Sequence, residues 1–392
     1  MAASVSAPRS ASVVIIGAGV IGCSIAYHLA QRGQTDVVVV ERATIGAGST
    51  SKAAGGIRAQ FANELEIRFS LEGIEHFKSF KDQFGVEIGY VQDGYLFVVT
   101  DPAVLARYER NVAFQNTFGV PSQIVTSEEV REIAPGISLD GVLAGVWCPT
   151  DGHATPNDVC MAYAAGARAR GVRFLEETTV TGMFQVVGGR VGVETTAGTI
   201  ETPCTVIAAG ANAAPVARML GVEVPVVPKR RHIFVTDNFD GVRHPLPLVI
   251  DTGSGFYARS EQQALLISPG DVGDVTDYLE APVDWGVLEQ TVDLGVRRFP
   301  SLERATVRSA WAGLRPLTPD EHAIVDWLPG VEGVFCTVGF CGHGFQHAPA
   351  TGNHVAELLL DGESSIDLSP LSFARFAGRD TTVRGSILSG VD

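Results

Sequence analysis

The sequence predicts an α/β fold, α+β overall, in which a parallel sheet is combined with a separate antiparallel sheet. Three observations support this. Residues 13–16 and 36–41 contain continuous β-branched runs, as expected for strands buried on both faces. A helical pattern over 20–32, closed by Gly33, lies between them, so a strand, a helix and a strand follow within about 30 residues. From 224 to 307, apolar and polar residues alternate between turns, which is typical of antiparallel strands.

The other elements follow from the same periodicities. Apolar residues at helical spacing and a proline after Thr155 predict helices over 63–84, 102–118, 156–170, 285–299 and 349–360. Apolar runs and turn signals predict strands within 90–99, 141–148, 172–198, 204–209 and 334–338. The polar tail after Ser369 is expected to be loosely held.

Composition restricts the classes of function. The net charge of the 392 residues is −15, which disfavours nucleic acid and anionic membranes as partners. No apolar run approaches the ~18 residues of a membrane span, and the run before the first glycine is too short for a signal peptide, so a cytoplasmic protein is expected. The six cysteines are scattered without a CxxC pair, so neither a metal site nor a disulfide framework is predicted.

The first loop carries a phosphate-binding pattern. Gly17, Gly19 and Gly22 form GxGxxG between the first strand and the first helix, and Glu41 ends the next strand. These glycines permit a tight turn, a close approach of the backbone to a pyrophosphate and close packing of helix on strand, while the helix N-terminus offers free N–H groups. Glu41 can accept hydrogen bonds from ribose hydroxyls and would repel a 2′-phosphate. The pattern therefore predicts a Rossmann-type dinucleotide-binding domain that does not take NADP.

A second glycine-rich turn favours FAD over NAD. Residues 339–345 have the sequence GFCGHGF and lead into the last predicted helix, about 320 residues after the first turn. A second helix N-terminus can serve the far half of a long cofactor. A nicotinamide dehydrogenase remains the alternative, and it would be colourless when purified.

Several motifs together resemble the D-amino-acid-oxidase-type flavoproteins, in particular the sarcosine oxidase, dimethylglycine dehydrogenase and proline dehydrogenase β-subunit branch. The matching segments are GAGVIG at 17–22, Glu41-Arg42, STSKAAGGIR at 49–58, DGHATP at 151–156, AAGAN at 208–212, WAGLRP at 311–316, TPD at 318–320 and GFCGHGF at 339–345. They run through nearly the whole chain.

The resemblance implies a division into non-contiguous segments. An FAD-binding domain would comprise 12–85, 148–228 and 309–368, a substrate domain with an antiparallel sheet would comprise 86–147 and 229–308, and 369–392 would be a C-terminal tail. The implied reaction oxidises the C–N bond of a secondary or N-methyl amine or amino acid by hydride transfer from carbon to flavin N5. The imine that results is then hydrolysed.

The resemblance also implies which residues contact FAD. They lie in the shared motifs and on one further strand: Gly17, Gly19, Val20, Ile21, Gly22, Glu41, Arg42, Ser49, Thr50, Ser51, Lys52, Ala54, Gly55, Gly56, Val180, Ala208, Ala209, Gly210, Gly313, Arg315, Gly342, His343, Gly344, Phe345 and Gln346. Gly313 stands where monomeric sarcosine oxidases carry a flavin-linked cysteine, and Lys52 stands near the flavin-linking histidine of the dimethylglycine type. FAD is therefore expected to be non-covalent.

Five residues are candidates for the catalytic site: Arg58, His343, Gln346, Tyr257 and Arg315. Arg58 falls where sarcosine oxidases hold the substrate carboxylate, and its planar guanidinium suits that group. Gln346 replaces a carboxylate-binding lysine of those enzymes. His232 and Arg259 lie on segments that could also face the flavin ring, whereas His322 is expected to be structural.

Three alternatives remain for the activity. A primary amino acid, glycine or a D-amino acid, would react by the same chemistry. A flavin-bearing subunit or assembly factor would have little turnover without a heteromeric partner or an electron acceptor protein. The chain has four lysines, and none follows residue 230, where the oxidases keep an oxygen-activating lysine. This absence slightly favours a dehydrogenase over an oxidase.

Overall fold

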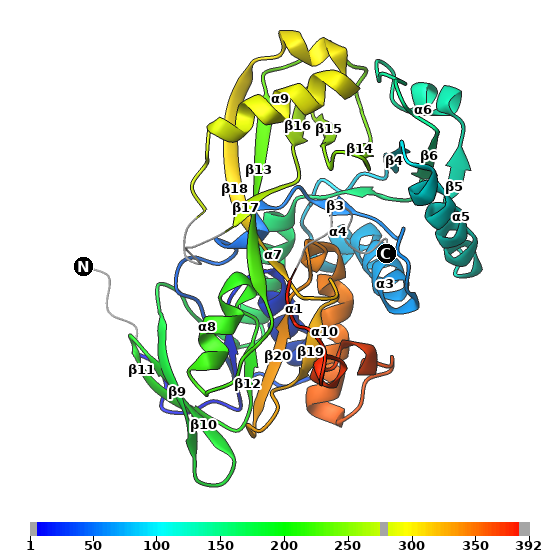
Figure 1. Ribbon diagram of the computed structural model, residues 1–392. Helices are drawn as coiled ribbons and strands as arrows, with labels where there is room; N and C mark the ends of the chain where they lie inside the picture. Colours follow the sequence, from blue (N-terminus) through cyan, green and yellow to red (C-terminus); the bar gives the residue numbers. More distant parts are fainter. Residues whose placement is uncertain (1–5, 275–280, 384–392) are drawn as a thin grey trace.

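The computed structural model describes residues 6–274 and 281–383, in which two large sheets occupy the lower and upper halves of Figure 1. The lower sheet has the strand order β19-β20-β12-β1-β2-β8, formed by Ile324–Trp327, Val334–Val338, Thr205–Ile207, Val13–Ile16, Val37–Val40 and Arg173–Leu175. Every pair in it is parallel except β19–β20 at one edge. Its central strands are buried along their whole length, which explains their continuous apolar runs.

Helices cover one face of this sheet. α1 (Val20–Gln31) packs between α7 (Pro156–Arg168) and α10 (Gly344–Asp361), and α3 (Glu64–Lys78) packs on α10. The other face carries a small antiparallel sheet and a short helix, which are β9 (Val180–Val186), β10 (Arg190–Thr195), β11 (Gly198–Thr202) and α8 (Ala213–Arg218). The parallel sheet is therefore enclosed on both sides.

The upper sheet is largely antiparallel and takes its strands from two separate parts of the chain. Its order is β17-β13-β16-β15-β14-β4-β6-β5, with β18 also paired to β13. The strands are Asp271–Asp274, Val227–Thr236, Ala264–Ser268, Tyr257–Glu261, Leu248–Asp251, Tyr95–Val99, Ala144–Cys148, Gln123–Val125 and, for β18, Val307–Leu317. The parallel pair β14–β4 joins the two parts.

Short elements complete the fold. Three helices pack on the upper sheet, which are α5 (Pro102–Thr117), α6 (Ser127–Ile133) and α9 (Gly286–Arg298). The others are α2 (Ser49–Lys52), α4 (Phe80–Phe84), the β3–β7 pair (Gly56–Ile57 and Gly152–His153) and the 3-10 helices Gly210–Asn212, Pro300–Arg304, Ser369–Leu371 and Phe373–Phe376. No helix in the described ranges is long and apolar enough to cross a membrane.

The predicted fold class is confirmed, but several predicted elements were wrong in detail. The helix predicted over 63–84 is broken at Ser79, whose hydroxyl donates to the carbonyls of Glu75 and His76 and so competes with the helix backbone. Of the strands predicted around Asp93-Gly94 within 90–99, the second is present as β4 from Tyr95, whereas Val91 before the turn forms only an isolated bridge to His153. Gly94 before β4 has φ +89°, and a Cβ there would lie 1.8 Å from the Trp147 ring.

The C-terminal part differs from expectation in three ways. α10 begins at Gly344 rather than 349, because Pro349 is accommodated inside the helix at the cost of one backbone hydrogen bond. The expected segment boundary at 308/309 falls inside β18, which pairs with β13. Residues 369–376 of the tail are held in place, because Leu371 is buried and Arg375 donates to Asp320 over 2.7 Å.

Candidate active site

A cavity of about 930 Å³ lies between the two sheets and is lined by residues from both. This volume is typical of a site for a cofactor or a small ligand. Almost all the residues predicted to contact FAD line it; among them, Gly22 and Ser51 do not. Ser51 is exposed and its hydroxyl donates to the Ala47 carbonyl, so Ser51 supports α2 rather than the cavity.

The first end of the cavity is built by the GxGxxG turn. Gly17 has φ +108°, and a Cβ there would lie 2.5 Å from the Ala208 carbonyl oxygen. A Cβ at Gly22 would lie 2.0 Å from the Gly17 carbonyl oxygen, so Gly22 allows α1 to pack on β1. α1 starts at Val20, whose N–H donates to Thr50 Oγ1 at 3.0 Å, and Gly19 has no side chain to cap the N–H groups that follow. Those following N–H groups are therefore available to an anion at the cavity.

Glu41 is fixed beside this turn. Its Oε2 accepts from the Ala18 N–H at 2.8 Å, and its Oε1 accepts from the Ala43 N–H at 2.9 Å. Each oxygen retains lone pairs toward the cavity that Glu41 lines. A held carboxylate next to a helix N-terminus with N–H groups to donate is the donor and acceptor set that a dinucleotide needs for its ribose and pyrophosphate. The residues present therefore fit the predicted cofactor.

A second helix N-terminus reaches the same cavity. α10 starts at Gly344, and His343 before it provides no side-chain cap. Gly342 has φ +90°, and a Cβ there would lie 3.0 Å from Cδ of Arg315. Arg315 itself donates from Nη1 to the Cys341 carbonyl at 3.0 Å. The turn and the arginine thus hold each other in place at the cavity wall.

Gly313 lies against Lys52 on another wall. A Cβ at Gly313 would approach Cβ of Lys52 to 2.6 Å, so a cysteine at this position would displace the lysine backbone or side chain. The Trp311 indole N–H donates to the Lys52 carbonyl at 3.0 Å and ties the same two segments together.

Arg58 is held from several sides at the cavity. Only 5% of it is exposed. Its Nη1 donates to the Gln60 carbonyl, its Nη2 donates to His343 Nε2 at 3.1 Å, and its Cζ lies 3.9 Å from the centre of the Phe61 ring. The Gln346 amide pairs twice with the Arg58 backbone, accepting from N–H and donating to C=O at 3.0 Å each. Gln346 therefore supports the segment that carries Arg58.

Two arginines, the buried Arg315 and the partly buried Arg231, lie together at the substrate-sheet end. Arg231 on β13 and Arg315 on β18 both pair with Asp271, and the Arg231 Nε–Asp271 Oδ1 distance is 2.9 Å. Burial raises the pKa of Asp271, but the two guanidinium groups outweigh burial and hold that pKa below its usual value. Tyr257 and Tyr95 line the same region, and burial raises the pKa of Tyr95 to about 12.

Two residues suggested by the sequence do not line the cavity. His232 lies on β13, where successive side chains alternate between faces, and it accepts from the Asp284 N–H at 3.0 Å. Its neighbour Arg231 faces the cavity instead. Arg259 donates to the Ala54 carbonyl at 3.0 Å and pairs with Glu261 at 2.8 Å.

The sequence interpretation missed several lining residues on the upper sheet, namely Tyr95, Phe97, Arg231, Ile233, Leu248 and Ile250. The alternation along β13 was a usable signal for Arg231 and Ile233, because the two lie on one face. The sequence does not show how β13 packs against the lower part of the molecule, and this packing decides which face of the strand lines the cavity.

Comparisons with known proteins agree with this geometry. The profile of a family described as "FAD dependent oxidoreductase" (DAO) matches residues 12–358. The chain is 29% identical to human mitochondrial sarcosine dehydrogenase over 94% of its own length but only 42% of that protein, and 28% identical to glycine oxidase of Geobacillus kaustophilus over 94% of the chain and 97% of that protein.

A solved structure described as L-proline dehydrogenase from P. horikoshii superposes with a TM-score of 0.87. It has 31% sequence identity and covers 95% of this chain and 99% of that one. The family match covers most of the chain, including both glycine-rich turns and the strands that line the cavity. The description of this family names FAD as its cofactor. The chain therefore belongs to the DAO family of FAD-dependent oxidoreductases.

Proposed function

We propose that the chain oxidises the C–N bond of a secondary or N-methyl amino acid, of the sarcosine, dimethylglycine or proline kind, with non-covalent FAD. The observation that carries this proposal is a group of three arginines at one end of the cavity, of which Arg58 and Arg315 are buried and Arg231 is partly buried. Asp271 compensates part of their charge. A substrate carboxylate would supply further negative charge, and guanidinium groups bind carboxylates through two parallel hydrogen bonds.

The same arginines affect the substrate amine. A nearby positive charge disfavours the ammonium form, so an amine bound beside these groups would lose its proton more readily than in water. Burial and the Arg58 charge also hold the pKa of His343 well below its ordinary value, so His343 is a neutral ring at the cavity wall. The protein would thus bind the amine neutral, with its nitrogen lone pair available and no separate general base required.

FAD supplies the hydride acceptor in this reaction. The arginines would orient the substrate by its carboxylate, and Tyr95, Phe97, Ile233, Leu248 and Ile250 would exclude water from the carbon that is oxidised. We propose that the acceptor of the reducing equivalents is a compound or protein other than oxygen. Among the described residues that line the cavity, Lys52 is the only lysine, and the segment after 230 contains none.

A primary amino acid is the second candidate substrate. The observation in its favour is that the chain is 28% identical to a glycine oxidase over 94% of its length, about as similar as it is to sarcosine dehydrogenase at 29%. The two candidates share the cavity and the chemistry, so only substrate tests separate them.

The test is anaerobic reduction of the purified yellow protein by a panel of amines: sarcosine, dimethylglycine, L-proline, glycine and D-alanine. Rapid bleaching of the flavin bands by one of the first three supports the proposal, and bleaching only by glycine or D-alanine replaces it with the second candidate. A flavin that no amine bleaches would instead point to a subunit that needs a partner. Slow reoxidation in air is expected for a dehydrogenase, and fast reoxidation would identify an oxidase.

A further inference from the structure

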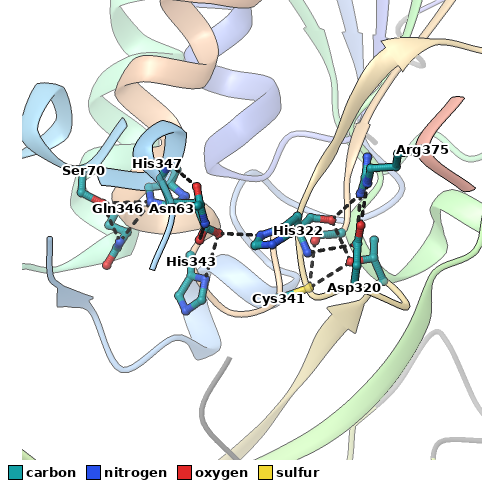
Figure 2. A network of polar contacts seen from close by, with 12 residues as sticks. Asn63, Ser70, Asp320, His322, Cys341, His343, Gln346, His347 and Arg375 are labelled. Atoms are coloured by element: carbon teal, nitrogen blue, oxygen red, sulfur yellow. Dashed lines mark hydrogen bonds and ion pairs between the residues drawn. The ribbon is translucent and has the colours of Figure 1, made fainter. Parts of the chain in front are cut away.

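Glu66 is a buried carboxylate directly behind the cavity. It lies on α3 and is 8% exposed, and it is not among the cavity-lining residues, whereas Arg58 and His343 are. A carboxylate is costly to bury unless it has polar partners. Asn63 Nδ2 donates to Glu66 Oε2 at 2.5 Å, and Glu66 Oε1 lies 3.5 Å from His322 Nδ1 and 4.0 Å from His343 Nδ1. Figure 2 shows Asn63, His322 and His343 converging from three segments.

The hydrogen bond from Arg58 indicates where the His343 proton lies. A guanidinium group has only donors, so His343 Nε2 must be the acceptor of the 3.1 Å contact with Arg58 Nη2. Burial and the charge of Arg58 keep the pKa of His343 low, so the ring is neutral and carries one proton. That proton must be on Nδ1, which has no hydrogen-bond partner among the described residues. Glu66 Oε1 lies 4.0 Å from Nδ1, beyond hydrogen-bond reach, but its negative charge attracts the proton electrostatically.

Arg58 in turn depends on this ring. Phe61 packs under the guanidinium and also meets the His343 ring edge to face, with 4.9 Å between the ring centres. The Gln346 amide fixes the Arg58 backbone but does not contact its guanidinium. The direction of the guanidinium at the cavity is therefore set by its acceptors, which include His343 Nε2 and the Gln60 carbonyl.

Glu66 is itself held as an anion. Burial raises the pKa of Glu66, but the hydrogen bond and the charge of His322 outweigh burial and lower it. His322 is fixed in turn, because its carbonyl accepts from Arg375 Nη2 at 2.8 Å and its N–H donates to Asp320 Oδ1 at 3.3 Å. Glu66 is therefore a negative charge in a fixed place, as the tautomer of His343 requires.

We propose that Glu66 is a positioning residue that holds His343 as the Nδ1–H tautomer and thereby orients the Arg58 guanidinium at the cavity. The proposal rests on the proposed function only in taking Arg58 as a ligand of the substrate carboxylate. Glu66→Gln keeps the size of the side chain but replaces the anion with an amide. Loss of the anion removes the electrostatic preference for a proton on His343 Nδ1, and a proton on Nε2 instead would leave two donors facing each other at Arg58.

The first measurement is the tautomer itself, by two-bond ¹H–¹⁵N correlation spectra of the protein labelled with ¹⁵N-histidine. The His343 signal is identified by its loss in His343→Gln. We expect the Nδ1–H tautomer in the wild-type protein and in Glu66→Asp, and the Nε2–H tautomer in Glu66→Gln. An Nε2–H tautomer in the wild-type protein, or an unchanged tautomer in Glu66→Gln, would overturn the proposal. An Nε2–H tautomer in the wild-type protein would overturn the proposal even if Glu66→Gln does not fold.

The second measurement is the dissociation constant of acetate, followed by its perturbation of the flavin spectrum. Loss of one hydrogen bond to a charged group predicts about tenfold weaker binding in Glu66→Gln. The control is Glu64→Gln on the same helix, because Glu64 is exposed and pairs with Arg68 at the surface. With a reducing amine, the expected change is in KM and not in kcat. Acetate binding that is equal in Glu66→Gln and Glu64→Gln contradicts the proposal.

The two measurements separate the two proposals. If acetate binds to none of the proteins, Arg58 is not a carboxylate ligand and the proposed function loses its main support. The tautomer of His343 in Glu66→Gln still decides whether Glu66 controls that ring.

Discussion

Two neighbouring histidines, the buried His28 and the partly buried His76, predict that the fold loses stability in mild acid. His28 on α1 is 7% exposed, and its ring lies 6.3 Å from that of His76 on α3, with Tyr163 beside both. Burial lowers the pKa of each to about 4, against 6.5 for an unperturbed histidine. Because the folded protein keeps both rings neutral, their contribution to stability is complete above pH 6.5 and is lost as the pH falls toward 4.

The size of this effect follows from the two pKa values. Between pH 7 and pH 5, a histidine with a pKa of about 4 in the folded state and about 6.5 in the unfolded state loses about 2 kcal/mol of stability. The two rings together lose at most about 4 kcal/mol, which is a large part of the ~5–15 kcal/mol that stabilises a typical protein.

The assay is urea unfolding at pH 7 and pH 5 with saturating FAD, followed by tryptophan fluorescence. His28→Leu should lose about 2 kcal/mol less than the wild-type protein over this interval, because it cannot take up the proton.

His354→Leu provides a control of opposite sign. Burial lowers the pKa of His354, but the Glu72 and Glu357 carboxylates outweigh burial and raise it. Its contribution is therefore present at low pH, and the variant should lose more stability on acidification than the wild-type protein. Equal losses in His28→Leu and the wild-type protein would refute the argument from buried neutral imidazoles.

Three further predictions concern the cofactor site and the core. Gly22→Ala should lower both the melting temperature and the FAD content, because the new Cβ would meet the Gly17 carbonyl oxygen at 2.0 Å; normal FAD content at an unchanged melting temperature would contradict this. Glu41→Gln should weaken FAD binding about tenfold in a fluorescence titration, because an amide cannot accept from both backbone N–H groups that Glu41 now binds. Arg298→Leu should cost about 3–5 kcal/mol in urea unfolding, because it leaves the buried Asp251 carboxylate without its ion-pair partner at 2.7 Å; a loss below about 1 kcal/mol would contradict this.

The sequence by itself determined the features that are local in the chain. The GxGxxG turn, the helix after it and Glu41 lie within 25 residues, 17–41, so the spacing alone predicts how they meet. The apolar runs at 13–16 and 37–40 predict buried parallel strands for the same reason, since nearly every side chain in them must avoid water. The second glycine-rich turn was also found, although its helix begins earlier than the proline indicated.

Only the tertiary structure decided which distant side chains meet. Arg58 and His343 are 285 residues apart, and their contact depends on β3 and α10 packing against each other. The sequence also left open which face of β13 lines the cavity, because a strand has two faces and long-range pairing determines which one is turned inward. In the structure, Arg231 faces the cavity and His232 faces away from it. Glu66 carried no signal in the sequence, because a carboxylate in the first turn of a helix is usually a solvated group. Its burial between two histidines is a consequence of three segments packing together, and that packing, rather than any local pattern, sets the charges around Arg58.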